Sequence, residues 1–156
     1  MADVKNPPEG YHTITAYITV DDAAKALEFY PKAFGATEIF RLPMGDKIGH
    51  AEIKIGDSHI MVADEMPDMN ILGPTARGGP TSALMLYTDD VDAAFKQAVE
   101  AGCTSAMEPD DMFWGDRMGT VFDPFGHKWS LAQQVEIVPP EEMAKRMAAF
   151  SEKNCG

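Results

Sequence analysis

The sequence of 156 residues contains only two cysteines, Cys103 and Cys155. Two thiols are too few for a disulfide framework, and their spacing fits no metal-binding motif. Basic residues are also scarce: 13 Lys and Arg stand against 25 Asp and Glu, giving a formal net charge of -12. Such a charge repels phosphate backbones, and no run of Lys or Arg offsets it. We therefore expect no nucleic-acid partner.

Long apolar runs are absent as well. None approaches the roughly 20 residues that a bilayer-spanning helix needs, and residues 1–10 lack the basic-then-apolar pattern of a secretory signal. We expect a cytoplasmic protein with no membrane partner. Hydrophobic residues make up 45% of the chain, which at this length is enough to bury a core without a disulfide or metal.

What the sequence does contain is an internal repeat. Residues 18–27 resemble residues 86–95, at an offset of 68 positions. After a one-residue slip, residues 35–37 match residues 102–104. Residues 58–62 align with residues 126–131 when Lys128 is taken as an insertion. Three matches in the same order indicate a tandem duplication.

The first copy predicts a strand followed by a helix. Residues 13–19 alternate between apolar and polar side chains, as a strand does when one face lies on an apolar layer. Asp21 or Asp22 can cap a helix that runs to Phe34. Gly35 is placed to end that helix in a left-handed turn.

The second copy repeats this pattern. Residues 83–87 alternate in the same way, and Asp89 and Asp90 precede a helix that Gly102 ends. Cys103 follows in what we expect to be a helix-to-strand turn, where it is a structural rather than a nucleophilic residue.

The remaining strands are predicted as hairpins. Residues 49–55 alternate, and a turn at residues 56–57 leads into a strand at residues 59–63. In the second copy, Asp-Pro-Phe-Gly at residues 123–126 is a turn, because Pro fixes one dihedral angle and Gly can adopt a positive one. His127 is expected to be a turn residue that reaches solvent, and residues 129–131 form the last strand.

These patterns divide the chain into five parts. They are an N-terminal extension (1–10), a first module (11–65), a Pro- and Gly-rich linker (66–80), a second module (81–138) and a helical tail (139–156). Pro140 suits the first turn of the tail helix, whose apolar face would be Met143, Met147 and Phe150.

The motifs of the second copy resemble those of a known superfamily. Trp-Gly-Asp-Arg at residues 114–117, followed by Asp-Pro-Phe-Gly-His-Lys-Trp at residues 123–129, is similar to the vicinal oxygen chelate superfamily, which contains glyoxalase I, bleomycin-resistance proteins and extradiol dioxygenases. Residues 113–119 and His-Ala-Glu at residues 50–52 most resemble its PhnB-like branch. The resemblance covers residues 11–133.

The resemblance implies an α+β fold of tandem βαβββ modules. Their mixed sheets would curl around a concave pocket, with helices on the convex side, and the chain would form a homodimer. Ile14, Ile18, Leu84 and Leu86 would then face the helices. The other alternating residues would line the pocket: Thr15, Tyr17, Met85 and Tyr87.

The resemblance also locates the usual metal ligands of the superfamily. They correspond to Thr15, Met61, Ala83 and Ser130, and the internal repeat pairs the same positions independently. None supplies an imidazole or a carboxylate, and a neutral thioether is too soft for a hard divalent ion. We therefore expect no metal at the usual centre and no other cofactor.

His50 and Glu52 offer an alternative centre. Two residues apart on a strand, they share one face and can converge on one ligand, with His59 nearby on the adjacent strand. The pair could act as a general acid and base or hold a relocated divalent metal. It could equally be a pair of polar residues on a half-exposed strand.

Trp114 and Arg117 form a second candidate cluster. The resemblance places them at the pocket rim, where Trp offers a stacking face and Arg a bidentate donor to a carboxylate or phosphate. Alternatively, Trp114 is a core residue and Arg117 pairs with Asp116 or Asp123.

Three functions compete. The first, which we favour, is metal-free binding of an apolar or aromatic small molecule by Thr15, Tyr17, Met61, Met85, Tyr87, Trp114, Arg117 and Ser130. The second is a lyase or isomerase that acts on a small oxygenated substrate, with His50 and Glu52 as catalytic residues. The third is an interaction platform that presents the tail helix. The sequence does not decide whether the protein is an enzyme.

Overall fold

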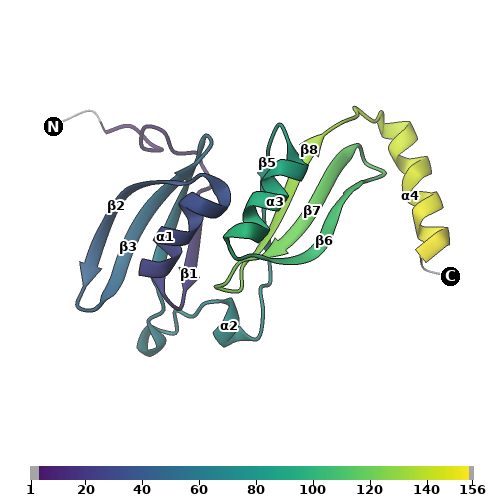
Figure 1. Cartoon of the computed structure of the whole chain (residues 1–156). Coiled ribbons are helices and arrows are strands. Elements are labelled where there is room, and N and C mark those ends of the chain that lie inside the picture. Colours follow the sequence, from purple (N-terminus) through teal and green to yellow (C-terminus); the bar gives the residue numbers. More distant parts are fainter. Residues whose placement is uncertain (1–3, 155–156) are drawn as a thin grey trace.

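The computed structural model describes residues 4–154 as two similar halves and a C-terminal helix (Figure 1). Module 1 consists of β1 (Ala16–Val20), α1 (Ala23–Phe34), β2 (Thr37–Met44), β3 (Lys47–Ile55) and β4 (Ser58–Asp64). A connection follows with the short helices η1 (Pro67–Met69) and α2 (Pro74–Arg77). Module 2 consists of β5 (Ala83–Tyr87), α3 (Val91–Ala101), β6 (Thr104–Asp111), β7 (Asp116–Phe122) and β8 (Lys128–Gln134). The last helix is α4 (Pro140–Asn154).

Each module forms a four-stranded mixed sheet. The strand order is β1-β4-β3-β2 in module 1 and β5-β8-β7-β6 in module 2. In both sheets the first strand runs parallel to its neighbour, and the other pairs are antiparallel. Within residues 4–154 the two sheets share no strand pair, so they do not close into one barrel. The predicted α+β fold with tandem βαβββ modules is confirmed.

The helices of the two modules begin and end alike. The carboxylates of Asp22 and Asp90 each accept a hydrogen bond of 3.0 Å from the backbone N–H three residues later. This contact satisfies a donor that has no partner inside the helix. Both helices end at the predicted glycines, with φ of 66° at Gly35 and 129° at Gly102. Of the alternatives left open, Asp22 and Asp90 are therefore the caps.

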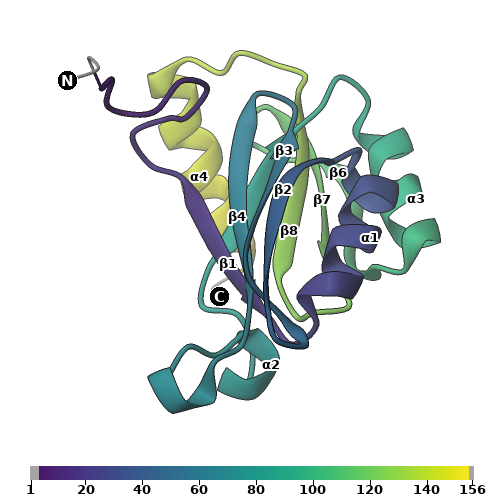
Figure 2. The same cartoon turned by 90° about the vertical axis from the view of Figure 1, so that its left-hand side faces the viewer.

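The core lies where each helix covers its own sheet. Ile53 and Val62 in module 1, and Val121 and Leu131 in module 2, are fully buried. Helices α1 and α3 also pack against each other, side by side in both views (Figures 1 and 2). The modules are therefore joined through their helices.

Asp123 anchors this junction from the turn before β8. Its Oδ2 atom accepts hydrogen bonds of 2.9 Å from the Tyr30 hydroxyl of module 1 and from Trp129 Nε1. Its Oδ1 atom accepts the backbone N–H groups of Phe125 and His127. Burial, together with the Asp123 carboxylate, raises the pKa of Tyr30 well above its usual value, so its hydroxyl stays protonated and donates.

Two expectations about single residues are wrong. Ile14 does not face a helix: it precedes β1 and is 89% exposed, whereas Ile18 in the same alternation is buried as expected. His127 does not simply reach solvent, because its Nε2 lies 2.8 Å from the Thr19 carbonyl oxygen of module 1. The alternation of residues 13–19 predicted which side of the sheet Ile18 faces, but it did not predict that β1 starts only at Ala16.

Helix α4 lies beside module 2, joined to β8 by a connection (Figure 1). It begins at Pro140 as predicted, and none of its described residues is buried. Phe150 contacts Phe113 with ring centroids 5.2 Å apart, and Arg146 pairs with Glu136 at 2.8 Å. None of the helices within residues 4–154 is long and apolar enough to cross a bilayer.

Candidate ligand-binding faces

Each sheet has an inner face, the face opposite its helix. In module 1, β-strand register sets Tyr17 and Glu52 on either side of Met61, with all three side chains on this face. Their neighbours Ile18 and Ile53 point the other way and are buried in the core. The inner face of module 1 therefore carries the predicted residues Tyr17, His50, Glu52 and Met61.

Three of these side chains form a hydrogen-bonded chain. The Tyr17 hydroxyl lies 2.9 Å from His50 Nδ1, and His50 Nε2 lies 3.2 Å from Glu52 Oε1. The ring of Phe40, on β2, adjoins that of His50 at 5.8 Å between centroids. The sequence predicted the proximity of His50 to Glu52 but not the contribution of Tyr17.

The arrangement has one consistent protonation pattern when the imidazole of His50 is neutral and Glu52 is ionised. A carboxylate only accepts, so His50 Nε2 carries the proton and donates to Glu52. His50 Nδ1 then accepts from the Tyr17 hydroxyl. The other Glu52 oxygen, Oε2, is buried without a hydrogen-bond partner among the described residues. A polar atom of this kind is costly unless something satisfies it.

The inner face of module 2 carries fewer ionisable side chains than that of module 1. Ser130 lies between Met85 and Thr120 in the strand register, and the Ser130 and Thr120 hydroxyls are 3.5 Å apart. Near the other end of β7, the buried Asp116 accepts a hydrogen bond of 3.1 Å from Trp114 Nε1. The Tyr87 hydroxyl lies 3.5 Å from the same carboxylate oxygen.

Large apolar side chains are exposed on both inner faces. Tyr17, Met85 and Tyr87 are 55%, 51% and 64% exposed. Met85 and Tyr87 also border a cleft of about 390 Å³ between β5 and the turn at residues 55–58 of module 1. Exposed aromatic and thioether surface of this kind is typical of a site that awaits an apolar partner.

Two predicted binding residues lie elsewhere. Arg117 points to the helix side of β7, where its guanidinium contacts both Asp92 oxygens at 2.9 Å and Asp111 at 3.1 Å. It pairs with neither Asp116 nor Asp123, so that alternative is wrong as well. These hydrogen bonds lower the pKa of Asp92 and raise the pKa of Arg117. Thr15 precedes β1, and its hydroxyl donates to the His12 carbonyl at 3.2 Å.

The donors at the usual metal positions do not fit a divalent ion. The structure supplies two hydroxyls, a thioether and a methyl group there, from Thr15, Ser130, Met61 and Ala83. His59, which the sequence predicts near this pair, lies opposite Lys54 in the strand register, and its ring stacks on Tyr11 at 4.2 Å. No group of three His, Cys, Asp or Glu side chains within residues 4–154 converges to hold a metal ion.

The fold and these faces can now be compared with known proteins. The family model described as the Glyoxalase/Bleomycin resistance protein/Dioxygenase superfamily matches residues 11–131. The chain belongs to this superfamily. The match names no branch within it, so assignment to the PhnB-like branch stays a prediction.

Comparisons with individual proteins extend this result. The chain is 41% identical over 140 residues to the uncharacterized protein Mb0911c of Mycobacterium bovis, covering 87% of this chain and 92% of the relative. A gene product of Arabidopsis thaliana has a similar structure, with a TM-score of 0.64 and 26% identity over 78% of this chain and 98% of that one. TnmS3 of Streptomyces sp. CB03234, an antibiotic binding protein, has a TM-score of 0.59 and 23% identity over 79% and 97% of the two chains.

Proposed function

We propose that this protein binds an apolar or aromatic small molecule on the inner faces of its sheets, without a metal at the usual superfamily centre. The observation that carries the proposal is the exposure of Tyr17, Met85 and Tyr87 on these faces. Aromatic rings offer large, rigid contact surfaces, and thioethers adapt to ligand shape. The structural similarity to TnmS3, which binds an antibiotic, supports this class of ligand.

Polar groups on the same faces would orient the ligand. His50 and Glu52 form one polar group in module 1, and Asp116 with Trp114 forms another in module 2. Ligand sites commonly combine an apolar lining with a few such groups. A ligand hydroxyl or amine that reaches Glu52 Oε2 would satisfy the unpartnered oxygen.

We also propose that the protein is a cytoplasmic homodimer. The exposed apolar side chains of β2, among them Phe40, Leu42 and Met44, continue the inner face and would be covered in a dimer. Sedimentation at micromolar concentration should give twice the 17.0 kDa chain mass. A species of single-chain mass would contradict the dimer without touching the binding proposal.

The binding proposal can be tested with N-phenyl-1-naphthylamine, a neutral aromatic dye that fluoresces in apolar surroundings. We expect saturable binding that is unchanged by a chelator. Tyr17→Ala and Tyr87→Ala should each weaken it about tenfold, the equivalent of about 1.4 kcal/mol. Val99→Ala is the control, because Val99 is 37% exposed on α3, on the other side of the module 2 sheet from the inner face. Absence of saturable binding, or equal weakening in the control, would reject the proposal.

A second candidate function is favoured by the Tyr17–His50–Glu52 chain. With its unpartnered Glu52 oxygen, this chain could act as a general acid–base group in a lyase or isomerase, or hold a relocated metal. Elemental mass spectrometry after equilibration with nickel, zinc, manganese and iron(II) tests the metal version. Stoichiometric metal that Glu52→Gln abolishes would favour this function over metal-free binding.

A further inference from the structure

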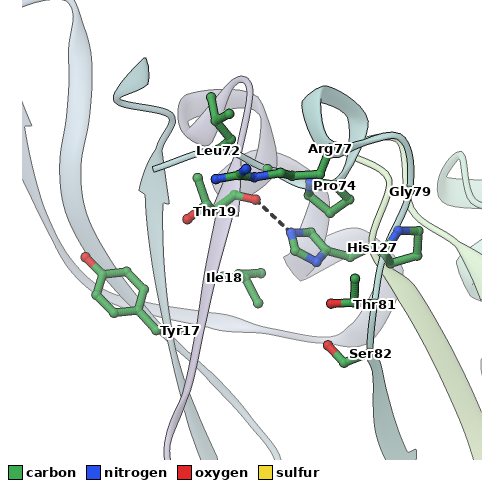
Figure 3. A pocket seen from close by; sticks show the side chains of 12 residues that line it. Tyr17, Ile18, Thr19, Leu72, Pro74, Arg77, Gly79, Thr81, Ser82 and His127 are labelled. Atoms are coloured by element: carbon green, nitrogen blue, oxygen red, sulfur yellow. Dashed lines mark hydrogen bonds between the residues drawn. The ribbon is translucent and has the colours of Figure 1, made fainter. Parts of the chain in front are cut away.

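A second cleft lies at the junction between the modules. It has a volume of about 470 Å³ and forms where the connection before β5 passes the outer edge of β1 (Figure 3). Its lining combines polar and apolar residues: Tyr17, Ile18, Thr19, Leu72, Gly73, Pro74, Arg77, Gly79, Pro80, Thr81, Ser82 and His127. The volume is within the range of small-molecule sites. We call it the junction cleft.

One wall of the junction cleft is the free edge of a sheet. Strand β1 is outermost in its sheet, and its Val20 carbonyl accepts from Glu65 N beside β4. Because successive residues of a strand turn their backbone groups to opposite sides, those of Thr19 and Tyr17 face outward. The Thr19 carbonyl indeed accepts from His127 Nε2 at 2.8 Å, as Figure 3 shows. The edge thus presents backbone donors and acceptors to the cleft.

The charge of the junction cleft is opposite to that of the whole chain. Within residues 4–154 no Asp or Glu belongs to its lining; the Glu65 carboxylate, which accepts from the Gly73 N–H at 2.7 Å, is outside it. The chain as a whole carries a net charge of -12. Arg77 is its permanent cation. In Figure 3 the Arg77 side chain reaches across the cleft toward Leu72 and Thr19, with His127 below it. A cation without a carboxylate beside it in the lining favours an anionic ligand.

The guanidinium of Arg77 retains donors for such a ligand. Its contacts within residues 4–154 are from Nη2, to the carbonyl and side-chain oxygens of Asn70 at 3.1 and 2.9 Å. Arginine has five N–H donors, so the other nitrogens can form the paired hydrogen bonds that a carboxylate accepts. Thr81 and Ser82 add two hydroxyl groups lower in the cleft (Figure 3).

We propose that the junction cleft binds a small monocarboxylate, with its carboxylate on Arg77 and its apolar part against Leu72, Pro74 and Pro80. A single permanent cation balances one negative charge. A phosphate dianion would need a second cation in a chain whose overall field repels it. The site goes beyond the proposed function: Tyr17 borders both regions, but Arg77 lines the junction cleft and is not among the inner-face residues described above.

The occupied cleft would connect both modules. Thr19 belongs to module 1, Arg77 to the connection, and His127 lies in the turn that enters β8. The His127–Thr19 hydrogen bond already spans 108 positions of the sequence at this point. A monocarboxylate would add contacts across the same junction and so stabilise the relative placement of the modules.

Backbone amide shifts of ¹⁵N-labelled protein test the site. Benzoate and hexanoate are titrated against their uncharged isosteres, benzamide and hexanamide. We expect saturable shifts for the non-proline residues of 72–82 and for His127 with at least one of the two carboxylates and with neither amide. Arg77→Gln should weaken that binding at least about tenfold, the usual scale for hydrogen bonds to a charged group. Arg41→Gln, which removes an exposed arginine of β2, should leave it unchanged.

Further variants separate loss of binding from loss of folding. Arg77→Lys keeps the charge but not the paired donors. It should therefore recover less than half of the binding free energy that Arg77→Gln removes. Arg77→Gln should leave N-phenyl-1-naphthylamine binding intact, which distinguishes the junction cleft from the inner faces. The proposal is overturned if neither carboxylate shifts these amides, if the isosteric amides bind equally well, or if Arg77→Gln and Arg41→Gln have the same effect.

Discussion

The two modules share a backbone plan but differ in the chemistry of their inner faces. Both sheets have the same strand order, and both helices are capped by an aspartate and ended by a glycine. The strand registers make Tyr17 equivalent to Met85, and Met61 equivalent to Ser130. They also match Glu52 with Thr120, and therefore His50 with Met118.

The comparison shows which part of a duplicated module is free to change. The helix side must fill a core, and it stays apolar in both copies. The inner face is not covered by α1 or α3, and there the Tyr17–His50–Glu52 chain of module 1 corresponds to Met85, Met118 and Thr120 of module 2. The ionisable Tyr17–His50–Glu52 chain therefore belongs to module 1, and the equivalent positions of module 2 offer thioether and hydroxyl contact surface.

The largest expected effect comes from comparing the turn before the last strand of each module. Asp123→Ala should lower the free energy of unfolding by about 4 kcal/mol, because it leaves Tyr30, Trp129 and two backbone N–H groups without their acceptor. Asp57, in the matching turn of module 1, has an 88% exposed side chain. Asp57→Ala should change stability by less than about 0.5 kcal/mol. Urea unfolding of both variants measures the contrast, and similar values would contradict it.

The inner faces can be exchanged in part. Thr120→Glu places the module 1 carboxylate in module 2, where Met118 cannot donate to it as His50 donates to Glu52. We expect a loss of about 3 kcal/mol, because Thr120 is buried and the new charge has no partner. Thr120→Val, the uncharged control of similar shape, should cost less than about 1 kcal/mol. Adding Met118→His to Thr120→Glu should recover at least about 1 kcal/mol; no recovery would undermine the proposed equivalence.

The smallest effect concerns Cys103, which takes the place of Ala36 in the repeat. Burial, with a contribution from Asp123, raises the pKa of its thiol to about 12. The unfolded thiol ionises near its ordinary pKa and the folded one does not. Stability should therefore be lost as pH rises from about 9 toward 12, by at most about 1.4 kcal/mol per pH unit. Cys103→Ala should remove this component in unfolding curves measured between pH 8 and 10.5; an identical pH dependence in both proteins would refute it.

The sequence predicted the repeat, the aspartate pairs that contain the helix caps, and the shared strand face of His50 and Glu52, because these depend on local spacing. It did not predict the partners of Arg117. Asp92 lies on α3, 25 positions away, and no local pattern links an exposed arginine to it. Alternation alone could have separated Arg117 from Asp116, since adjacent strand residues point to opposite faces. The contact of His127 with Thr19 depends on how the modules dock, which no single segment encodes.

The docking of two fused modules through α1 and α3 also has a genetic consequence. In an assembly of identical subunits, every substitution appears twice, once in each symmetric copy. Here the halves are encoded separately, so one codon change alters one inner face and leaves the other as it was. The Tyr17–His50–Glu52 chain is a difference of this kind. A fused chain can therefore differ between its two inner faces while both halves keep the same backbone plan.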